Sequence, residues 1–191
     1  MSKPTREHTL TRVLNTGFEK AADSFSRFIN RNIKITDSKS SLMQHNHKDE
    51  ACISEEKGRL YVLITRVIGD VTGKSFLICS EDECREIFGT LNTGDDKLNE
   101  AFLLEIDNIV SAMVISELSR SLGIEVFGDV PQLTKIDAKD LNPFILGEVV
   151  RDESRSVITN TTFQFDHRKI HPQFIWKFNS KILDMIPEHS S

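Results

Sequence analysis

A long apolar stretch from Ala101 to Ser119 is the feature of this sequence that most constrains the fold. Gly123 follows it, at the position where a glycine commonly ends a helix, so the stretch predicts one long helix. Apolar residues dominate the stretch, so the polar residues Glu105 and Asn108 stand out. Because they are three residues apart, an α-helix makes them neighbours on one face. A carboxylate beside a carboxamide can bind a cation and orient a water molecule, so the pair is a candidate site.

The same pair has an ordinary alternative explanation. Glutamate and asparagine at this spacing occur by chance on many solvent-exposed helix faces. Taken alone, they more often belong to such a face than to a functional site. Whether Glu105 and Asn108 form a functional site must therefore be judged from the sequence around them.

The N-terminal part of the chain aligns with this helix at a constant offset. Arg12–Asn15 aligns with Glu105–Asn108, and Ser26 aligns with Ser119, in both cases 93 residues apart. A short strand-like run follows each helix. The two segments form a weak internal repeat, in which the asparagine is shared but an arginine replaces the glutamate in the first copy.

Periodicity and turn residues predict the remaining elements. Ser80 and Glu83 form a capping box at the start of the second helix. No linker divides the chain, so we predict one domain over residues 1–191, with repeat one at about 5–80 and repeat two at about 98–186. The other predicted elements are helices at 9–30, 80–88 and 179–186; strands at 32–36, 59–69, 74–79, 124–127, 149–150, 157–165 and 173–178; loops at 37–56 and 89–96; and a turn at 151–156. Residues 135–147 give no clear pattern.

The order of motifs around the long helix resembles a known family. Glu-x-x-Asn is followed by an apolar helix, Leu118-Ser119, Leu122-Gly123, a short strand and Pro131. This order resembles the CheC-like phosphatases of bacterial chemotaxis, and the segment Gly69–Ile78 is similar to the hairpin before that family's second helix. The resemblance covers most of the chain and is most specific from Gly69 to Leu133. It implies an α+β fold in which two pseudo-symmetric helix-plus-strands repeats share one mostly antiparallel sheet, with two long helices side by side on one face.

The resemblance also implies a function. Proteins of the CheC/CheX-like family dephosphorylate the aspartyl-phosphate of a CheY-like response regulator. Carried over to this chain, Asn108 would position the attacking water and Glu105 would pair with a lysine of the regulator. Such a reaction needs positioning and charge compensation more than covalent help. The phosphorylated regulator would bring its own Mg²⁺, so the resemblance implies no cofactor on this chain.

Several residues depart from the family pattern. Asp107 stands where the family often has glycine, and it adds a negative charge one residue from the site. Val110 and Met113 stand where small residues are common. In the degenerate first-copy site, Arg12 and Asn15, the charge at the acidic position is reversed. We therefore expect one active centre per chain, and a homodimer is left open.

Two other functions are compatible with the same residues. The chain could be a non-catalytic CheC/FliY-like adaptor that binds a response regulator or the flagellar switch without hydrolysis. It could also be a structural or sensory domain in which Glu105 and Asn108 are only surface residues. An exposed helix face bearing both side chains favours the first two functions over the third, and hydrolysis of a phosphorylated receiver domain separates the phosphatase from the adaptor.

Composition argues against several other classes. The net charge of −5 gives no basic field for nucleic acid. Three cysteines are too few and too scattered for a disulfide framework or a zinc site, and His45 and His47 lack further ligands around them. His167 and His171 are predicted to lie in a solvent-exposed turn. The N-terminus has no signal-peptide core and no segment could span a bilayer, so we expect a cytoplasmic protein with no membrane partner.

Overall fold

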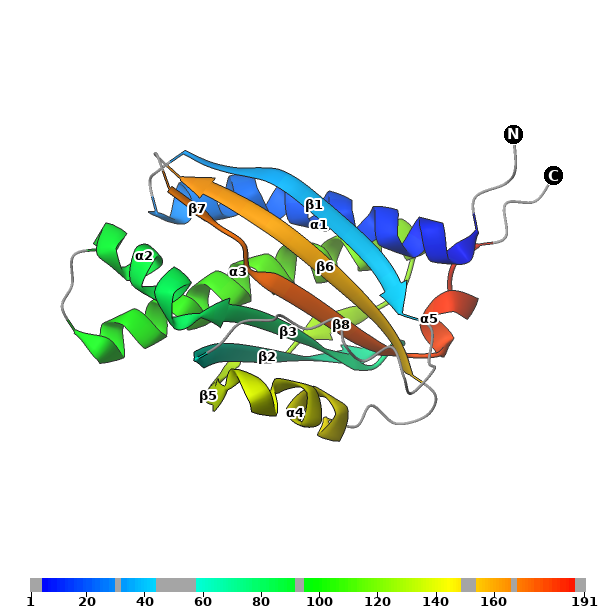
Figure 1. Ribbon diagram of the computed structural model, residues 1–191. Coiled ribbons are helices and arrows are strands. Elements are labelled where there is room, and N and C mark those ends of the chain that lie inside the picture. Colours follow the sequence, from blue (N-terminus) through cyan, green and yellow to red (C-terminus); the bar gives the residue numbers. More distant parts are fainter. Residues whose placement is uncertain are drawn as a thin grey trace.

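The computed structural model describes residues 5–29, 32–43, 58–91, 95–148, 154–165 and 168–187 (Figure 1). The two long helices are α1 (Arg6–Ile29) and α3 (Asp96–Leu122). The short helices are α2 (Glu81–Leu91), η1 (Ala138–Asp140), α4 (Leu141–Gly147) and α5 (Lys181–Asp184). The strands are β1 (Ile33–Met43), β2 (Arg59–Gly69), β3 (Gly73–Ser80), β4 (Val126–Gly128), β5 (Gln132–Asp137), β6 (Ser154–Phe165), β7 (Arg168–Ile170) and β8 (Gln173–Asn179).

The strands form one antiparallel sheet in the order β1-β6-β8-β3-β2-β4, with β5 also paired to β2 and β7 to β6. The hairpin β2–β3 belongs to the first half of the chain, and β6–β8 belongs to the second. At each edge, the first strand of one half pairs with the hairpin of the other half: β1 with β6, and β4 and β5 with β2. The sheet order is therefore the same from both edges, and the predicted pseudo-symmetric α+β fold is confirmed.

The two long helices lie side by side on one face of this sheet (Figure 1). Side chains alternate between the faces of each strand. In β3, Leu77 and Cys79 join the core beneath α1 and α3, whereas Phe76 and Ile78 join a second core covered by α4. The sheet is thus buried on both faces, which leaves the outer surfaces of α1 and α3 as the broad helical faces available to a partner.

The two helices approach closely at Gly17 of α1. A Cβ atom added there would lie 2.7 Å from the Cα atom of Val114 on α3. Only a glycine allows this approach, because real Cβ atoms do not come so close to a backbone atom. Gly17 therefore sets the distance between the helix that carries the first-copy residues and the helix that carries Glu105 and Asn108.

Gly17→Ala is expected to destabilise the protein. Alanine is the better helix former by about 1 kcal/mol, but overpacking a close contact typically costs about 1–3 kcal/mol, and this contact is with backbone. Chemical unfolding measures the difference. Gly147→Ala is the matched control, since an added Cβ at Gly147 meets nothing within 4 Å. An unchanged or raised stability of the Gly17 variant would show that the helices separate at little cost.

Several predicted elements agree with the structure. Gly123 ends α3 in the left-handed conformation, with φ 67°. In the capping box, the Ser80 backbone N–H donates to the Glu83 carboxylate at 3.0 Å, and the Glu83 N–H donates back to the Ser80 hydroxyl at 3.3 Å. The β2–β3 hairpin and strands β6 and β8 also lie where the sequence predicts them.

Other predicted boundaries are wrong. Residues 37–43 are not loop but continue β1, because their backbone pairs with β6, for example Ser38 with Thr161. Of the predicted loop at 89–96, residues 89–91 belong to α2 and Asp96 begins α3. The Asp95 side chain accepts a hydrogen bond from the Lys97 N–H at 2.9 Å and so caps α3. The closing helix is only Lys181–Asp184.

Further differences concern short elements. The strand predicted at 124–127 is displaced to β4, and the unassigned region 135–147 contains the end of β5, η1 and α4. Residues 168–170 are predicted to lie in a turn, but they form β7 and pair with β6. Strand β6 begins at Ser154, within the turn predicted at 151–156. Three predictions lie outside the described residues. They are the strand at 149–150, the remainder of the loop at 37–56, which contains His45 and His47, and the position of His167.

Candidate functional site

Glu105 and Asn108 lie on the outer face of α3. Asn108 is exposed and Glu105 is half-buried, whereas their neighbours Ile106 and Val110 are buried in the core. Within the described part of the chain, neither polar side chain forms a hydrogen bond or an ion pair. The structure thus brings the predicted carboxylate and carboxamide together on one accessible face, with their polar atoms free to contact a partner.

An apolar patch lies one to two helical turns before this pair. Leu98 is 52% exposed, and the ring of Phe102 stacks on that of Phe28 from α1, with 5.5 Å between centroids and Phe28 45% exposed. In the other direction, the next two exposed residues of α3 are small, Ala112 and Ser116, and the exposed Arg120 follows only near the end of the helix. The pair therefore lies between an apolar anchor and a stretch of helix that another backbone can approach closely.

The Asp107 side chain points away from the face that carries Glu105 and Asn108. It is fully buried and points to the sheet, where it accepts hydrogen bonds from Thr65 of β2 at 2.7 Å and from Ser111 at 3.3 Å. Ser111 also lies 3.3 Å from the hydroxyl of Ser75 on β3. Asp107 is thus next to Asn108 in sequence, but its carboxylate lies in the core, because the residue follows the inward stripe of α3.

Burial dominates the ionisation of this aspartate. It raises the pKa of Asp107 from 3.8 to about 6, although the hydrogen bonds from Thr65 and Ser111 act in the opposite direction. A buried acid with only hydroxyl partners is costly to ionise. Asp107 therefore fixes α3 to β2 and β3 through a polar network whose charge depends on pH near neutrality.

The first-copy residues have surroundings unlike those of the second copy. The carboxamide oxygen of Asn15 accepts hydrogen bonds from Ser40 at 2.6 Å and from Ser38 at 3.3 Å, both on β1. Its partner position, Arg12, is exposed and lines a cleft between α1 and the C-terminal part of α3. The first copy thus lacks the acid and also lacks a free carboxamide oxygen.

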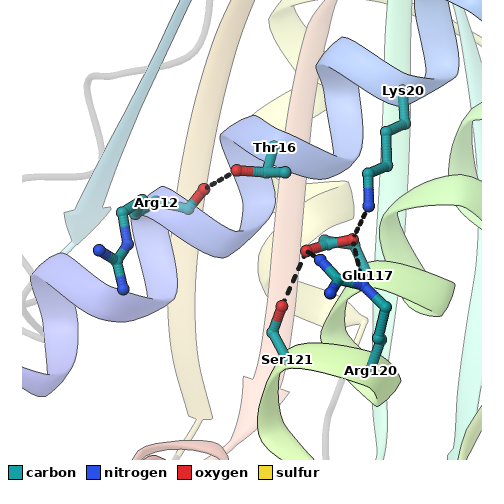
Figure 2. Close-up of polar contacts among 6 residues, drawn as sticks. All are labelled: Arg12, Thr16, Lys20, Glu117, Arg120 and Ser121. Atoms are coloured by element: carbon teal, nitrogen blue, oxygen red, sulfur yellow. Dashed lines mark hydrogen bonds and ion pairs between the residues drawn. The ribbon is translucent and has the colours of Figure 1, made fainter.

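A buried carboxylate that the sequence reasoning missed lines the same cleft as Arg12 (Figure 2). Glu117 of α3 is only 3% exposed, and its carboxylate accepts hydrogen bonds from Lys20 of α1, from Arg120 and, at 2.8 Å, from Ser121. Burial alone would raise the pKa of Glu117, but these donors outweigh it and lower the pKa to about 2. The basic residue three positions after Glu117 and the serine four positions after it were the available signals.

The metal-ligand side chains and the cysteines of the described residues are further candidates for a functional site. Among the described residues, no group of three or more His, Cys, Asp or Glu side chains is arranged to hold a metal ion. Cys79 and Cys84 are buried free thiols, as predicted for free cysteines, and Cys52 lies outside the described residues. In the same part of the chain, no helix is long and apolar enough to cross a bilayer.

Comparison with known proteins identifies the fold. No protein-family model and no curated protein sequence matches the chain. Among solved structures, FliY from Thermotoga maritima is similar with a TM-score of 0.70 at 14% identity, over 97% of this chain and 96% of that one. A chain of the FliG–FliM complex from H. pylori gives 0.69 at 10% identity, over 96% of this chain and 100% of that one.

A third solved structure connects the fold to CheX. A chain of the CheX–CheY–BeF3–Mg²⁺ complex from Borrelia burgdorferi is similar with a TM-score of 0.52 at 16% identity, over 87% of this chain and 98% of that one. The described chain therefore has the CheC/CheX-like fold, shared with FliY and FliM chains. At these identities the likeness concerns the fold alone.

Proposed function

We propose that this protein hydrolyses the aspartyl-phosphate of a CheY-like response regulator. The observation that carries the proposal is the pair of an exposed Asn108 and a half-buried Glu105, both free of partners within the described residues, on the outer face of a long helix in a CheC/CheX-like fold. The similar CheX chain is found in a complex with CheY, BeF3 and Mg²⁺. We expect the reaction to take place in the cytoplasm, where such a regulator would be found.

In this proposal the chain supplies positioning rather than covalent chemistry. The Asn108 carboxamide hydrogen-bonds a water molecule in line with the phosphorus atom. The water oxygen forms the new P–O bond while the bond to the regulator's aspartate breaks, which releases inorganic phosphate and a carboxylate. Glu105 pairs with a lysine of the regulator and fixes the docking register. Holding reactants in line accounts for a large share of such rate enhancements, and Mg²⁺ stays on the regulator.

The direct test follows phosphate release from a phosphorylated receiver domain. We expect the wild-type chain to accelerate release above the spontaneous rate of the receiver alone, at catalytic rather than stoichiometric amounts. The same loss of phosphate with and without the chain, over several receiver domains, would refute hydrolysis.

A second function, an adaptor that binds a regulator or a flagellar-switch component, is favoured by a different observation. The likeness to FliY and to a chain of the FliG–FliM complex is higher than the likeness to the CheX chain, with TM-scores of 0.70 and 0.69 against 0.52. An adaptor would bind a receiver domain or a switch protein without shortening the lifetime of the phosphoryl group. Measuring binding and hydrolysis on the same samples separates the two functions.

Glu105→Gln is expected to weaken the complex with the regulator and to leave turnover at saturation nearly unchanged. Exposed ion pairs contribute roughly 0.2–1 kcal/mol, so we expect a dissociation constant up to about fivefold higher. Salt screens such a pair, and the affinity of the variant should therefore depend less on ionic strength than that of the wild type.

Glu125→Gln is the matched control for this measurement, because Glu125 is an exposed glutamate after the end of α3 and the substitution removes the same charge. A docking role for Glu105 predicts no change in the control. A large fall in turnover at saturating regulator, with unchanged affinity, would instead make Glu105 a general base.

A further inference from the structure

A cleft of about 340 Å³ lies between α1 and the C-terminal part of α3, away from Glu105 and Asn108. Its polar lining comes from two helix faces. Residues three, four and seven apart share a face of a helix. The polar lining residues of α1 have all three spacings, and those of α3 lie three and four residues after Glu117. The polar lining residues are Thr9, Arg12 and Thr16 on α1 and Glu117, Arg120 and Ser121 on α3. The volume is in the range of small-molecule sites, which span roughly 300–1,000 Å³.

The charges in and beside the cleft do not balance. The cations are Arg12, Lys20 and Arg120, and the only carboxylate among the described lining residues is Glu117. Lys20 and Arg120 contact Glu117, whereas Arg12 lies further along α1 (Figure 2). Both oxygens of that carboxylate are already engaged, one by Arg120 and Ser121 and the other by Lys20 and Arg120. The negative charge is thus compensated locally, and the cleft keeps an excess of positive charge in a chain whose net charge is −5.

Several hydrogen-bond donors among the residues that line the cleft have no acceptor within the described residues. The Arg12 guanidinium is exposed and has no hydrogen bond or ion pair with any described residue. Arg120 contacts Glu117 through Nε and Nη2, which holds its guanidinium in place and leaves Nη1 unused by that contact. The Thr9 hydroxyl has no side-chain hydrogen bond in the described part of the chain. A guanidinium group presents several N–H donors in a planar fork that matches carboxylate and phosphate oxygens.

We propose that this cleft binds a small organic oxyanion, a molecule with a phosphate or carboxylate group on an apolar body. Arg12 supplies the free fork, and Arg120, held by Glu117, supplies a second cation. Inorganic phosphate would fill only part of the volume. Val13, Leu122 and Pro187 line the remainder and offer apolar contact to the body of the ligand.

The test titrates phenyl phosphate and inorganic phosphate into the full chain, with binding followed by calorimetry and by NMR shifts of the amides of Thr9 and Ser121. We expect saturable binding of both, with phenyl phosphate tighter because its ring contacts the apolar lining. Arg12→Ala should weaken both at least about tenfold, since a charged hydrogen-bond partner is lost. Arg12→Lys should weaken them less, because it keeps the charge but not the fork.

Arg27→Ala is the matched control. Arg27 is an exposed arginine on α1 that does not line the cleft, and its loss should leave binding unchanged. Equal weakening by the Arg12 and Arg27 variants, shifts scattered over the basic surface, or no saturable binding would overturn the proposal. Binding of an acidic peptide but not of phenyl phosphate would also overturn it, because the ligand would then be a side chain of a partner protein. None of these readouts depends on phosphatase activity.

Discussion

Asn108→Ala is expected to reduce receiver-domain dephosphorylation at least about 100-fold, whereas Asn15→Ala should leave it nearly unchanged. Asn108 is exposed, its carboxamide is free of partners within the described residues, and no other amide shares its face of α3 with Glu105. Misplacing an attacking group by about 1 Å can cost 100-fold in rate, and removal of the carboxamide leaves the water with no positioning group. The measurement is single-turnover release of phosphate at saturating chain.

Asn15 is the internal control for this prediction, because it stands at the matching position of the first repeat. Its carboxamide oxygen is occupied by Ser38 and Ser40, so Asn15→Ala should lower stability slightly and leave the rate alone. Binding of the regulator should survive in the Asn108 variant, since the apolar patch and Glu105 remain. Equal losses from the two substitutions would contradict the single-centre interpretation, and full activity of Asn108→Ala would remove the proposed site.

The sequence predicted those parts of the fold that depend on local periodicity. The apolar repeat of the two long helices, the Ser80–Glu83 capping box and the glycine at the end of α3 are all encoded within a few residues of where they act. The resemblance to the CheC-like family added the pseudo-symmetric sheet, which the strand order confirms. The outward position of Glu105 and Asn108 follows from the same helical periodicity, because Leu103, Ile106 and Val110 mark the buried stripe of α3.

Features that depend on contacts between residues far apart in the sequence could not be predicted from local periodicity. The polar residues 37–43 read as loop, and only their pairing with β6, more than 100 residues away, makes them an edge strand. The same strand supplies the serines that occupy Asn15. The Lys20–Glu117 contact likewise joins residues on two helices, and neither helix alone indicates it.

The position of Asp107, in contrast, could have been inferred. It lies four residues after Leu103 and three before Val110, so it falls on the stripe of α3 that faces the sheet. Asp107 is adjacent to Asn108 in sequence, but adjacent residues on a helix point about 100° apart. The periodicity was the stronger signal, and it places a carboxylate in the core.

Asp107→Asn is expected to stabilise the protein at pH 8 by up to roughly 3 kcal/mol and to flatten the dependence of stability on pH. Burial raises the pKa of Asp107 from 3.8 to about 6 in the folded chain, and one pKa unit corresponds to about 1.4 kcal/mol. Between these two values the folded state holds a proton that the unfolded state has released. Wild-type stability therefore falls as the pH rises from about 4 to about 6, and the full cost is present above that window.

An asparagine has no charge to desolvate, and it can still hydrogen-bond both Thr65 and Ser111 by accepting from one hydroxyl and donating to the other. Urea unfolding from pH 4.5 to pH 8 tests this. Ionisation of Glu117 has the opposite effect on stability, because its pKa is lowered from 4.5 to about 2. The stability that the Glu117 carboxylate contributes is lost only as the pH falls below 4.5, which is outside the range of this measurement. Asp23→Asn, at an exposed aspartate of α1, is the control and should leave the wild-type pH profile intact. If Asp107→Asn lowers stability at pH 8, the hydroxyl network requires the ionised carboxylate, and the charge on Asp107 holds α3 on the sheet instead of straining it.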